Sequence, residues 1–326
     1  MAERLIYTVA VAWLALTGVF LLVAFMPGDP AYSLAVGIAQ ERNITLEQAL
    51  EIAHRLMGYN PKEDLWGSYV AFLKGIFQGH FGYSTFYKVP VVEIVRQALP
   101  WTLLVLLGAT LISFLLGSFL GAWAAQKRAT FLEPVVTMTS AAVQALPPFI
   151  LAILILFVGA VRWHLLPLGG AYAVDMAPSF SFTFGLSVLR HAIGPMLATA
   201  LPQLAAWTLA MRANTTQVLG EDYIRFAQVR GLPDRVIASR YIRKNAILPL
   251  VASLAVGLGY MLGGHTLVEA VFNYPGIGFY FAKAIAVRDF GLLTGLFSLI
   301  VLAVLAATLL AEILYGLIDP RVRVRS

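Results

Sequence analysis

The stretch Leu99–Ala125, LPWTLLVLLGATLISFLLGSFLGAWAA, contains no charged residue. A helix of about 20 residues crosses a ~30 Å hydrocarbon core at 1.5 Å per residue, and this run is long enough to do so. Lipid offers the peptide backbone no hydrogen-bonding partner, so a spanning segment of this kind must be a helix. The stretch therefore predicts a transmembrane helix and places the chain among integral membrane proteins.

The composition of the whole chain agrees with this class. Its 326 residues are 60% hydrophobic and 12% charged, whereas soluble domains have roughly 25% charged residues. The net charge of +6 does not indicate nucleic-acid binding, because basic residues in membrane proteins mostly report topology. The chain has no cysteine and its five histidines are scattered, so we expect neither a disulfide framework nor a metal site.

Five further apolar runs are long enough to span a membrane, which predicts an all-α fold with six transmembrane helices. They are Leu5–Phe25, Pro134–Val161, Ile193–Val218, Ile247–Val268 and Phe290–Leu317. The first lacks a small-residue cleavage site, so we interpret it as a retained span rather than a signal peptide. Prolines 147, 148 and 202 predict tilting or kinking of the runs that contain them. Two pairs of glycines one turn apart, Gly117–Gly121 and Gly259–Gly263, predict close helix crossings.

The distribution of basic residues predicts that both termini are cytoplasmic. With the N-terminus inside, the inner segments carry Lys127, Arg128, a basic run between residues 225 and 244, and three arginines after residue 320. The two short outer loops carry only Arg162 and Arg190, then Lys283 and Arg288. The sequence thus predicts three parts. Residues 1–98 form the first helix and an external cap, 99–318 a five-helix core with a loop at 220–245, and 319–326 a basic cytoplasmic tail.

The long stretch after the first span contains two candidate amphipathic helices. Thr45–Met57 has a possible N-cap at Thr45 and apolar residues spaced as one helix face. Leu65–Phe77 is the second candidate. Together they form either a small helical cap on the outer face or a pair of helices that lie at the level of the lipid headgroups.

The loop between the fourth and fifth runs is charged in a chain that otherwise avoids charge. It reads EDYIRFAQVRGLPDRVIASRYIRKNAILPL from Glu221 to Leu250. Gly231 suits the position just after a helix, because glycine adopts a positive φ without strain. Pro233 suits the first turn of a following helix, where its missing N–H is not needed. The pattern predicts a helix, a tight turn and a second helix.

One face of the first short helix combines aromatic, small and basic residues at helical spacing. Its members are Tyr223, Phe226, Ala227 and Arg230. Such a face suits insertion into a groove on a partner protein. The alternative is a hairpin that lies on anionic lipid through the basic residues between 235 and 244.

This loop resembles the EAA loop of ABC importer permeases. The matching residues are Asp222-Tyr223, Phe226-Ala227, Gly231 and Asn245-Ala246-Ile247-Leu248-Pro249. Ala227 corresponds to the second alanine of the family pattern and Gly231 to its glycine. The strict Glu-Ala-Ala opening is replaced by Arg225-Phe226-Ala227.

Further motifs, in order along the chain, narrow the resemblance. They are Pro27-Gly28-Asp29-Pro30, Gly79-His80-Phe81-Gly82-Tyr83-Ser84, Leu99-Pro100-Trp101-Thr102-Leu103, Val268–Gly278, Arg288-Asp289 and Asp319-Pro320-Arg321-Val322-Arg323. The second is similar to a GDxGxS element, with His80 in place of the acidic residue. Over nearly its whole length the chain is similar to the first, B-type permease subunit of dipeptide, oligopeptide and nickel ABC importers.

This resemblance implies a transport subunit of the cell membrane and not an enzyme. Its partners would be a second, C-type permease, two ABC ATPase subunits and an extracytoplasmic substrate-binding protein. The chain has no G-x-x-x-x-G-K-[ST] loop with which to hold nucleotide phosphates. ATP and Mg would therefore belong to the ATPase subunits, and this chain would carry no cofactor.

The resemblance also implies which residues couple the chain to an ATPase. They are Asp222, Tyr223, Phe226, Ala227, Arg230, Gly231 and Pro233. Gly231 would set the angle of the turn, and Ala227 would permit close approach. Outward loops would receive the binding protein through Phe272, Tyr274, Pro275 and Gly276, unless these aromatics only mark the edge of the membrane.

Scarce polar residues within the runs predict the lining of a translocation path, because such groups rarely face lipid. The candidates are Thr137, Ser140 and Gln144; Gln203, Trp207 and Asn214; and Tyr260 and His265. Hydrogen bonding between helices is their alternative role. We expect Arg212 to extend its long side chain to the inner surface, and Glu269 to pair with His265 one turn away.

The substrate and two other protein classes stay open at this stage. Peptides are the first expectation from the resemblance, but family members also carry nickel complexes and oligosaccharides. A stand-alone secondary carrier would need coupling-ion carboxylates within its spans, and Glu312 is the serious candidate. An intramembrane serine protease would need a Ser–His or Ser–Lys pair at membrane depth, and no paired motif stands out.

Overall fold

The computed structural model describes residues 2–25, 30–57, 64–127, 130–251, 253–254 and 266–318. Over these ranges the secondary structure is helical, and the one β contact is an isolated bridge between Tyr83 and Pro90. The all-α class predicted from the apolar runs is confirmed.

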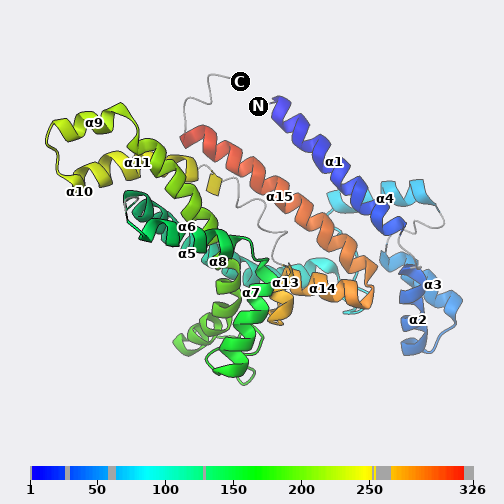
Figure 1. Cartoon of the computed structure of the whole chain (residues 1–326). Helices are drawn as coiled ribbons and strands as arrows, with labels where there is room; N and C mark the ends of the chain where they lie inside the picture. The colour runs from blue at the N-terminus through cyan, green and yellow to red at the C-terminus, as the bar shows by residue number, and fades with distance from the viewer. Residues whose placement is uncertain are drawn as a thin grey trace.

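Four helices in the described part of the chain are long and apolar enough to cross a membrane. They are α1 (Ala2–Ala24), α5 (Val91–Gln126), α8 (Phe182–Leu219) and α15 (Phe290–Ile318), shown in Figure 1. They correspond to the predicted first, second, fourth and sixth spans. With 36 and 38 residues, α5 and α8 are about 54 and 57 Å long, so both extend well beyond a ~30 Å hydrocarbon core. The helix α8 is continuous through Pro202.

The predicted third span, Pro134–Val161, is not one helix. Its residues form α6 (Leu132–Gln144), α7 (Pro148–Ile155) and the π-helical segment η1 (Leu156–Arg162), with a 96° bend between α6 and α7. Two prolines cause the break, since Pro147 is extended at ψ 137° and Pro148 begins α7. A proline lacks the N–H that would continue the helix and forces the preceding residue out of the helical region.

The predicted fifth span, Ile247–Val268, lies largely outside the described residues. The same holds for two path candidates, Tyr260 and His265, for the motif residues 27–29 and for the tail 319–326. The described helices therefore give four spans, or five if the bent pair counts as one. The predicted total of six is not confirmed.

The helices α5 and α8 pack closely because small residues line their contact. A Cβ atom added at Gly117 would lie 2.7 Å from the carbonyl oxygen of Leu204, and one at Gly121 would lie 2.3 Å from that of Thr208. Neither distance is tolerable between backbone and side chain, so both positions require glycine for close approach. The close crossing predicted from this glycine pair is present.

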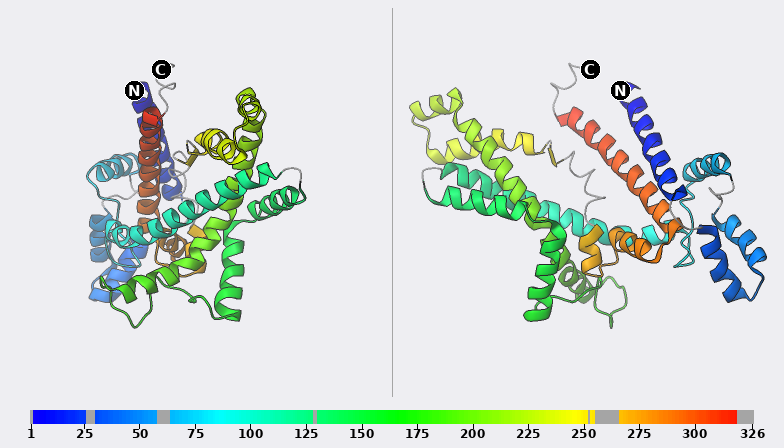
Figure 2. Two further views of the ribbon diagram at one scale, coloured as in Figure 1. Left: turned by 90° about the vertical axis from the view of Figure 1, so that its left-hand side faces the viewer. Right: turned by 45° about the vertical axis from the view of Figure 1, so that its right-hand side comes forward.

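A second layer pairs the first helix with the last. Helices α1 and α15 lie side by side with opposite directions in Figures 1 and 2, so the start of α1 and the end of α15 are neighbours. The helix α4 (Leu65–Phe77) contacts α1. There Phe72 and Ile76 of α4 pack against Leu16 and Phe20 of α1.

The stretch between α1 and α5 contains one helix more than the sequence predicted. Helix α3 (Leu46–Met57) begins after Thr45, whose hydroxyl accepts a hydrogen bond of 3.4 Å from the backbone N–H of Gln48. It packs against α2 (Pro30–Arg42) through small and aliphatic side chains of both helices. Figures 1 and 2 place this pair at one end of the molecule, and the helices α9 and α10 at the other.

Two short helices, α13 (Thr266–Val271) and α14 (Ile277–Val287), precede α15. The buried carboxylate of Glu269 accepts a hydrogen bond of 2.7 Å from the backbone N–H of Gly278 at the start of α14. The hydroxyl of Thr102 on α5 accepts another, of 2.8 Å, from the N–H of Ile277. These two backbone N–H groups at the start of α14 have no partner within the helix, and α13 and α5 supply their acceptors.

Candidate functional site

A helical hairpin follows α8 in the described chain. Its first arm is α9 (Asp222–Val229), and its second consists of α10 (Asp234–Val236), the π-helical η2 (Ile237–Arg243) and α11 (Lys244–Ala246). Figure 1 shows the hairpin projecting at the end of α8. The helix, turn and helix predicted from the sequence are present.

The turn between the arms is closed by Gly231, which has φ +70°. Its backbone N–H donates to the carbonyl of Gln228 at 2.9 Å, and the N–H of Leu232 donates to that of Ala227 at 3.2 Å. This pair of bonds is the Schellman ending of a helix. A Cβ at Gly231 would meet no described atom within 4 Å, so the position favours glycine for its backbone angle rather than for space.

Pro233 lies one position earlier than predicted. It is the cap of α10 rather than a residue of its first turn, and Asp234 is the first helical residue. The carbonyl of Pro233 accepts hydrogen bonds from the N–H groups of Val236 at 2.8 Å and Ile237 at 3.2 Å. The negative side chain of Asp234 still lies at the positive end of the second arm.

The two arms enclose a small apolar interior. It is formed by Ile224 and Ala227 from α9 and by Ile237 and Ile242 from η2, all of them buried. Ala227 therefore faces the second arm and not the outer side of α9 that the helical spacing suggested. Its small side chain allows the two arms to approach each other.

The outward face of α9 consists of Tyr223, Phe226, Val229 and Arg230. Phe226 is 70% exposed and Val229 is 87% exposed, while the hydroxyl of Tyr223 accepts a bond of 3.3 Å from the side-chain amide of Asn245. Covering a large apolar side chain stabilises a complex by about 1.5–3 kcal/mol. An exposed Phe and Val at the tip of a rigid hairpin suit a surface that a partner covers.

The base of the hairpin is fixed to the helices that span the membrane. The side-chain amide of Asn214 on α8 donates a bond of 3.2 Å to the carbonyl of Ala246. Ala246 and Leu250 pack with Met211 of α8 and Phe114 of α5. A displacement of the hairpin would therefore move α8 and the start of the next apolar run with it.

The candidate path residues of α8 contact neighbouring helices. The amide oxygen of Gln203 accepts bonds from Ser113 at 3.2 Å and Thr110 at 3.4 Å, both on α5. The ring of Trp207 stacks edge-on against that of Phe114 at 5.2 Å. With Asn214 bonded to Ala246, all three make the interhelical contacts that were the alternative interpretation.

The three candidates on α6 have different surroundings. Thr137 donates a bond of 3.1 Å to the carboxylate of Glu133, Ser140 is buried, and Gln144 is exposed at the end of the helix. Glu133 extends this polar stripe by one turn, and the spacing of four residues to Thr137 would have revealed it.

Arg212 does not extend freely to the inner surface as predicted. Its guanidinium forms an ion pair with Glu133 and so joins α8 to α6. Both side chains are partly buried, so losing one partner would leave the other charge poorly solvated. The partner lies 79 residues away, so the short-range sequence pattern did not reveal it.

The candidate binding-protein contacts lie mostly inside the structure. Phe272 and Tyr274 are 2% and 0% exposed, and Gly276 is buried. Phe272 packs on Gly194, where a Cβ would lie 2.6 Å from the ring, and Tyr274 stacks edge-on against Trp101 at 6.3 Å. In this arrangement neither aromatic ring is available to a partner. Glu269 bonds to Gly278, while its expected partner His265 lies outside the described residues.

Comparison with known proteins gives two findings. Residues 117–324 match the family described as "Binding-protein-dependent transport system inner membrane component". The chain is 30% identical to a probable peptide ABC transporter permease of Sinorhizobium fredii, over 98% of each chain. It is 27% identical to a dipeptide transport system permease of Escherichia coli and 26% identical to an oligopeptide transport system permease of Bacillus subtilis. Each of these alignments covers 93% of this chain and 92% of the relative.

Proposed function

Because the chain belongs to the family of binding-protein-dependent transport system inner membrane components, we propose that it is the B-type permease of an ATP-driven peptide importer. Its path would be formed together with a second, C-type permease. Two ATPase subunits and an extracytoplasmic binding protein would complete the transporter. The observation that carries the proposal is the α9–α11 hairpin, a rigid tip with exposed Phe226 and Val229.

The orientation of the chain follows from its basic residues. The hairpin carries six of them, namely Arg225, Arg230, Arg235, Arg240, Arg243 and Lys244. By the positive-inside rule, the hairpin and both termini would lie in the cytoplasm. The helices α2 and α3, at the opposite end of the molecule in Figure 2, would lie outside.

The hairpin is suited to transmit movement. Its interior is packed and its base is bonded to α8, so a push on the outward face moves the hairpin as one body. In the proposed mechanism, ATP binding closes the two ATPases and displaces α9, and α8 follows. Such a lever needs two discrete states with different contacts in each.

Peptides are the proposed substrate because the relatives compared above are named for peptide, dipeptide or oligopeptide transport. Nickel complexes and oligosaccharides are the alternatives. The binding protein would fix this choice, so its ligand is the direct measurement. A purified binding protein that holds only sugar or nickel would contradict the peptide assignment and leave the permease assignment intact.

The permease assignment is tested by reconstitution. The tagged chain should co-purify with a second permease and two ATPases, and Phe226→Glu should reduce the recovery of the ATPases at least tenfold. Peptide uptake into vesicles should require the full set of subunits, the binding protein and ATP. Transport by vesicles that contain this polypeptide alone would contradict the proposal.

A further inference from the structure

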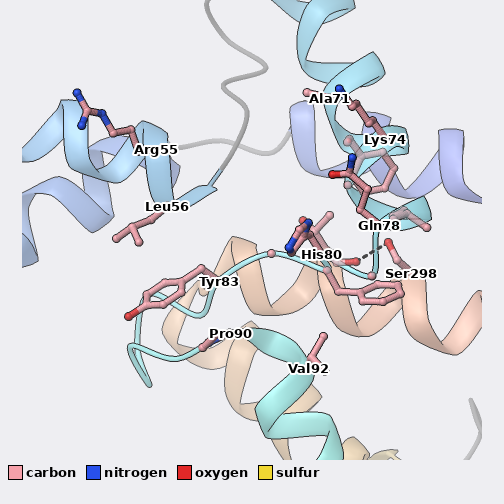
Figure 3. Close-up of a pocket in the computed structure, with 17 residues that line it drawn as sticks. Arg55, Leu56, Ala71, Lys74, Gln78, His80, Tyr83, Pro90, Val92 and Ser298 are labelled. Atoms are coloured by element: carbon pink, nitrogen blue, oxygen red, sulfur yellow. Dashed lines mark hydrogen bonds between the residues drawn. The ribbon is translucent and has the colours of Figure 1, made fainter.

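We propose that the cavity beside α4 binds the headgroup of an anionic phospholipid, on the side of the molecule away from the α9–α11 hairpin. The cavity has a volume of about 670 Å³, within the usual range for small-molecule sites. Figure 3 shows Arg55 and Leu56 of α3 on one side, Lys74 and Gln78 at α4 on the other, and His80 and Tyr83 on the segment that follows. The inference is independent of the transported substrate.

The charge of the cavity favours an anion. Lys74 and Arg55 line it together with the imidazole of His80, and none of its described lining residues is an Asp or Glu. Lys74 forms no ion pair with another described residue, whereas Arg55 contacts Glu51 at 3.4 Å with both side chains more than 70% exposed. Such an exposed pair is weak, so Arg55 can turn to a phosphate. The side-chain amide of Gln78 adds a neutral donor.

Apolar side chains, here called the apolar wall, line the same cavity between these polar groups. The apolar wall consists of Leu56, Ala71, Phe72, Ile76, Phe81 and Val92. A free phosphate ion gains nothing from such a wall, because it has no apolar surface to remove from water. A phospholipid carries a phosphate and acyl chains in one molecule, so it matches both parts of the cavity.

The position of the cavity in the fold fits the boundary between headgroups and hydrocarbon. Thr294 and Ser298 line it, and both belong to the apolar window Phe290–Leu309 of α15. The helix α4 also carries Trp66 and Phe77, which are 74% and 89% exposed. Exposed aromatic residues next to a lysine are typical of the membrane interface. The cavity therefore opens where a lipid headgroup would be.

The test is native mass spectrometry of the full chain with phosphatidylglycerol or phosphatidylcholine of identical acyl chains. The wild type should retain phosphatidylglycerol in preference. The double variant Lys74→Gln/His80→Gln should lose about fivefold in that preference, the effect expected for one basic residue near an anionic lipid. The matched control, Arg162→Gln/Arg190→Gln, removes two exposed basic residues outside the cavity and should retain it.

A second variant tests the apolar wall without changing charge. Ala71→Trp should fill the cavity and reduce retention of phosphatidylglycerol while Lys74 and His80 are intact. Equal retention of both lipids by the wild type, or an unchanged preference in both cavity variants, would overturn the proposal. Displacement of the lipid by inorganic phosphate would assign the site to a free anion instead. The proposal would also be overturned if the Lys74→Gln/His80→Gln variant lost affinity for the substrate-binding protein while its retention of lipid was unchanged.

Discussion

The carboxylate of Asp289 accepts a hydrogen bond of 2.5 Å from the hydroxyl of Ser84, which lies 205 residues earlier in the chain. Both side chains are fully buried. The same carboxylate accepts bonds from the backbone N–H groups of Thr85 at 3.2 Å and Phe86 at 3.0 Å, and from that of Leu292 at 3.0 Å. One side chain thus caps α15 and fixes the segment that leads into α5.

Replacing this carboxylate should destabilise the protein strongly. Asp289→Ala removes the acceptor and leaves several buried donors unpaired, which we expect to cost about 2–4 kcal/mol. Asp289→Asn should have a smaller effect, because one oxygen can still accept from Leu292 and Thr85. Thermal unfolding in detergent measures both. Asp175→Ala, at an exposed position, is the control, and an equal loss in the control variant would contradict the anchoring role.

The left-handed backbone of Gly231 gives a prediction about coupling. The side chain of Gly231→Trp would enter open space. The backbone angle of φ +70° at this position, however, is unfavourable for tryptophan and costs about 1–2 kcal/mol of local strain. We expect the variant to remain folded by size-exclusion chromatography and to lose peptide-stimulated ATP hydrolysis in the assembled transporter. Gly231→Asn, which tolerates this conformation, should keep most of that activity. Normal peptide uptake by Gly231→Trp would contradict a coupling role for the turn.

The two sides of α9 should respond differently to substitution. Phe226→Ser changes an exposed side chain, so the thermal midpoint should stay unchanged while ATPase recovery falls. Ala227→Leu overpacks the interior between the arms. It should cost about 1–3 kcal/mol of stability and so lower the thermal midpoint. Phe131→Ser, at a phenylalanine that is 75% exposed at the start of α6, is the matched control for Phe226. If that control reduces ATPase recovery equally, the outward face is not specific.

Local signals accounted for most of what could be predicted. Long apolar runs gave α1, α5, α8 and α15, because spanning length and hydrophobicity are properties of the segment itself. Thr45 predicted the start of α3, and Gly231 and Pro233 predicted the break in the hairpin, because caps and turns depend on a few neighbouring residues.

Features that depend on distant partners were not predictable in this way. A short helix with apolar residues on two sides does not reveal which side its return arm covers, so Ala227 was placed outward although it faces Ile237 and Ile242. Phe272 and Tyr274 are buried only because Gly194 and Trp101 come to them from other helices. The helix α2 was missed because its apolar residues form no clear stripe until α3 covers them.

A contact between Lys88 and Glu41 gives a pH dependence. The amine of Lys88 bonds to the carboxylate of Glu41 at the end of α2, and this hydrogen bond and the positive charge lower the pKa of Glu41 below its usual 4.5. A depressed folded-state pKa means that the stabilisation is present above the unfolded-state pKa and is lost as pH falls through the folded-state value. The thermal midpoints of wild type and Lys88→Met should therefore differ at neutral pH and converge in acid. A difference in thermal midpoint that grows in acid would contradict the pairing. High salt should reduce the difference between wild type and Lys88→Met at any pH, because salt screens the two charges.

The ion pair between Arg212 and Glu133 is the direct charged link from α8 to α6 in the described structure. Arg212→Leu leaves the Glu133 carboxylate, whose side chain is only 16% exposed, without its charged partner. The variant should therefore destabilise the fold more than a surface change does, by about 2–4 kcal/mol. The double variant Arg212→Leu/Glu133→Leu removes both charges and should recover most of that loss, because neither group then remains buried and unpaired. Thermal unfolding of the two single variants and the double variant forms a cycle that isolates the coupling between them. Additive losses in the double variant would show that the pair contributes nothing. The control is Arg230→Leu, which gives the baseline for losing one positive charge. Arg230 is exposed and forms no ion pair with another described residue.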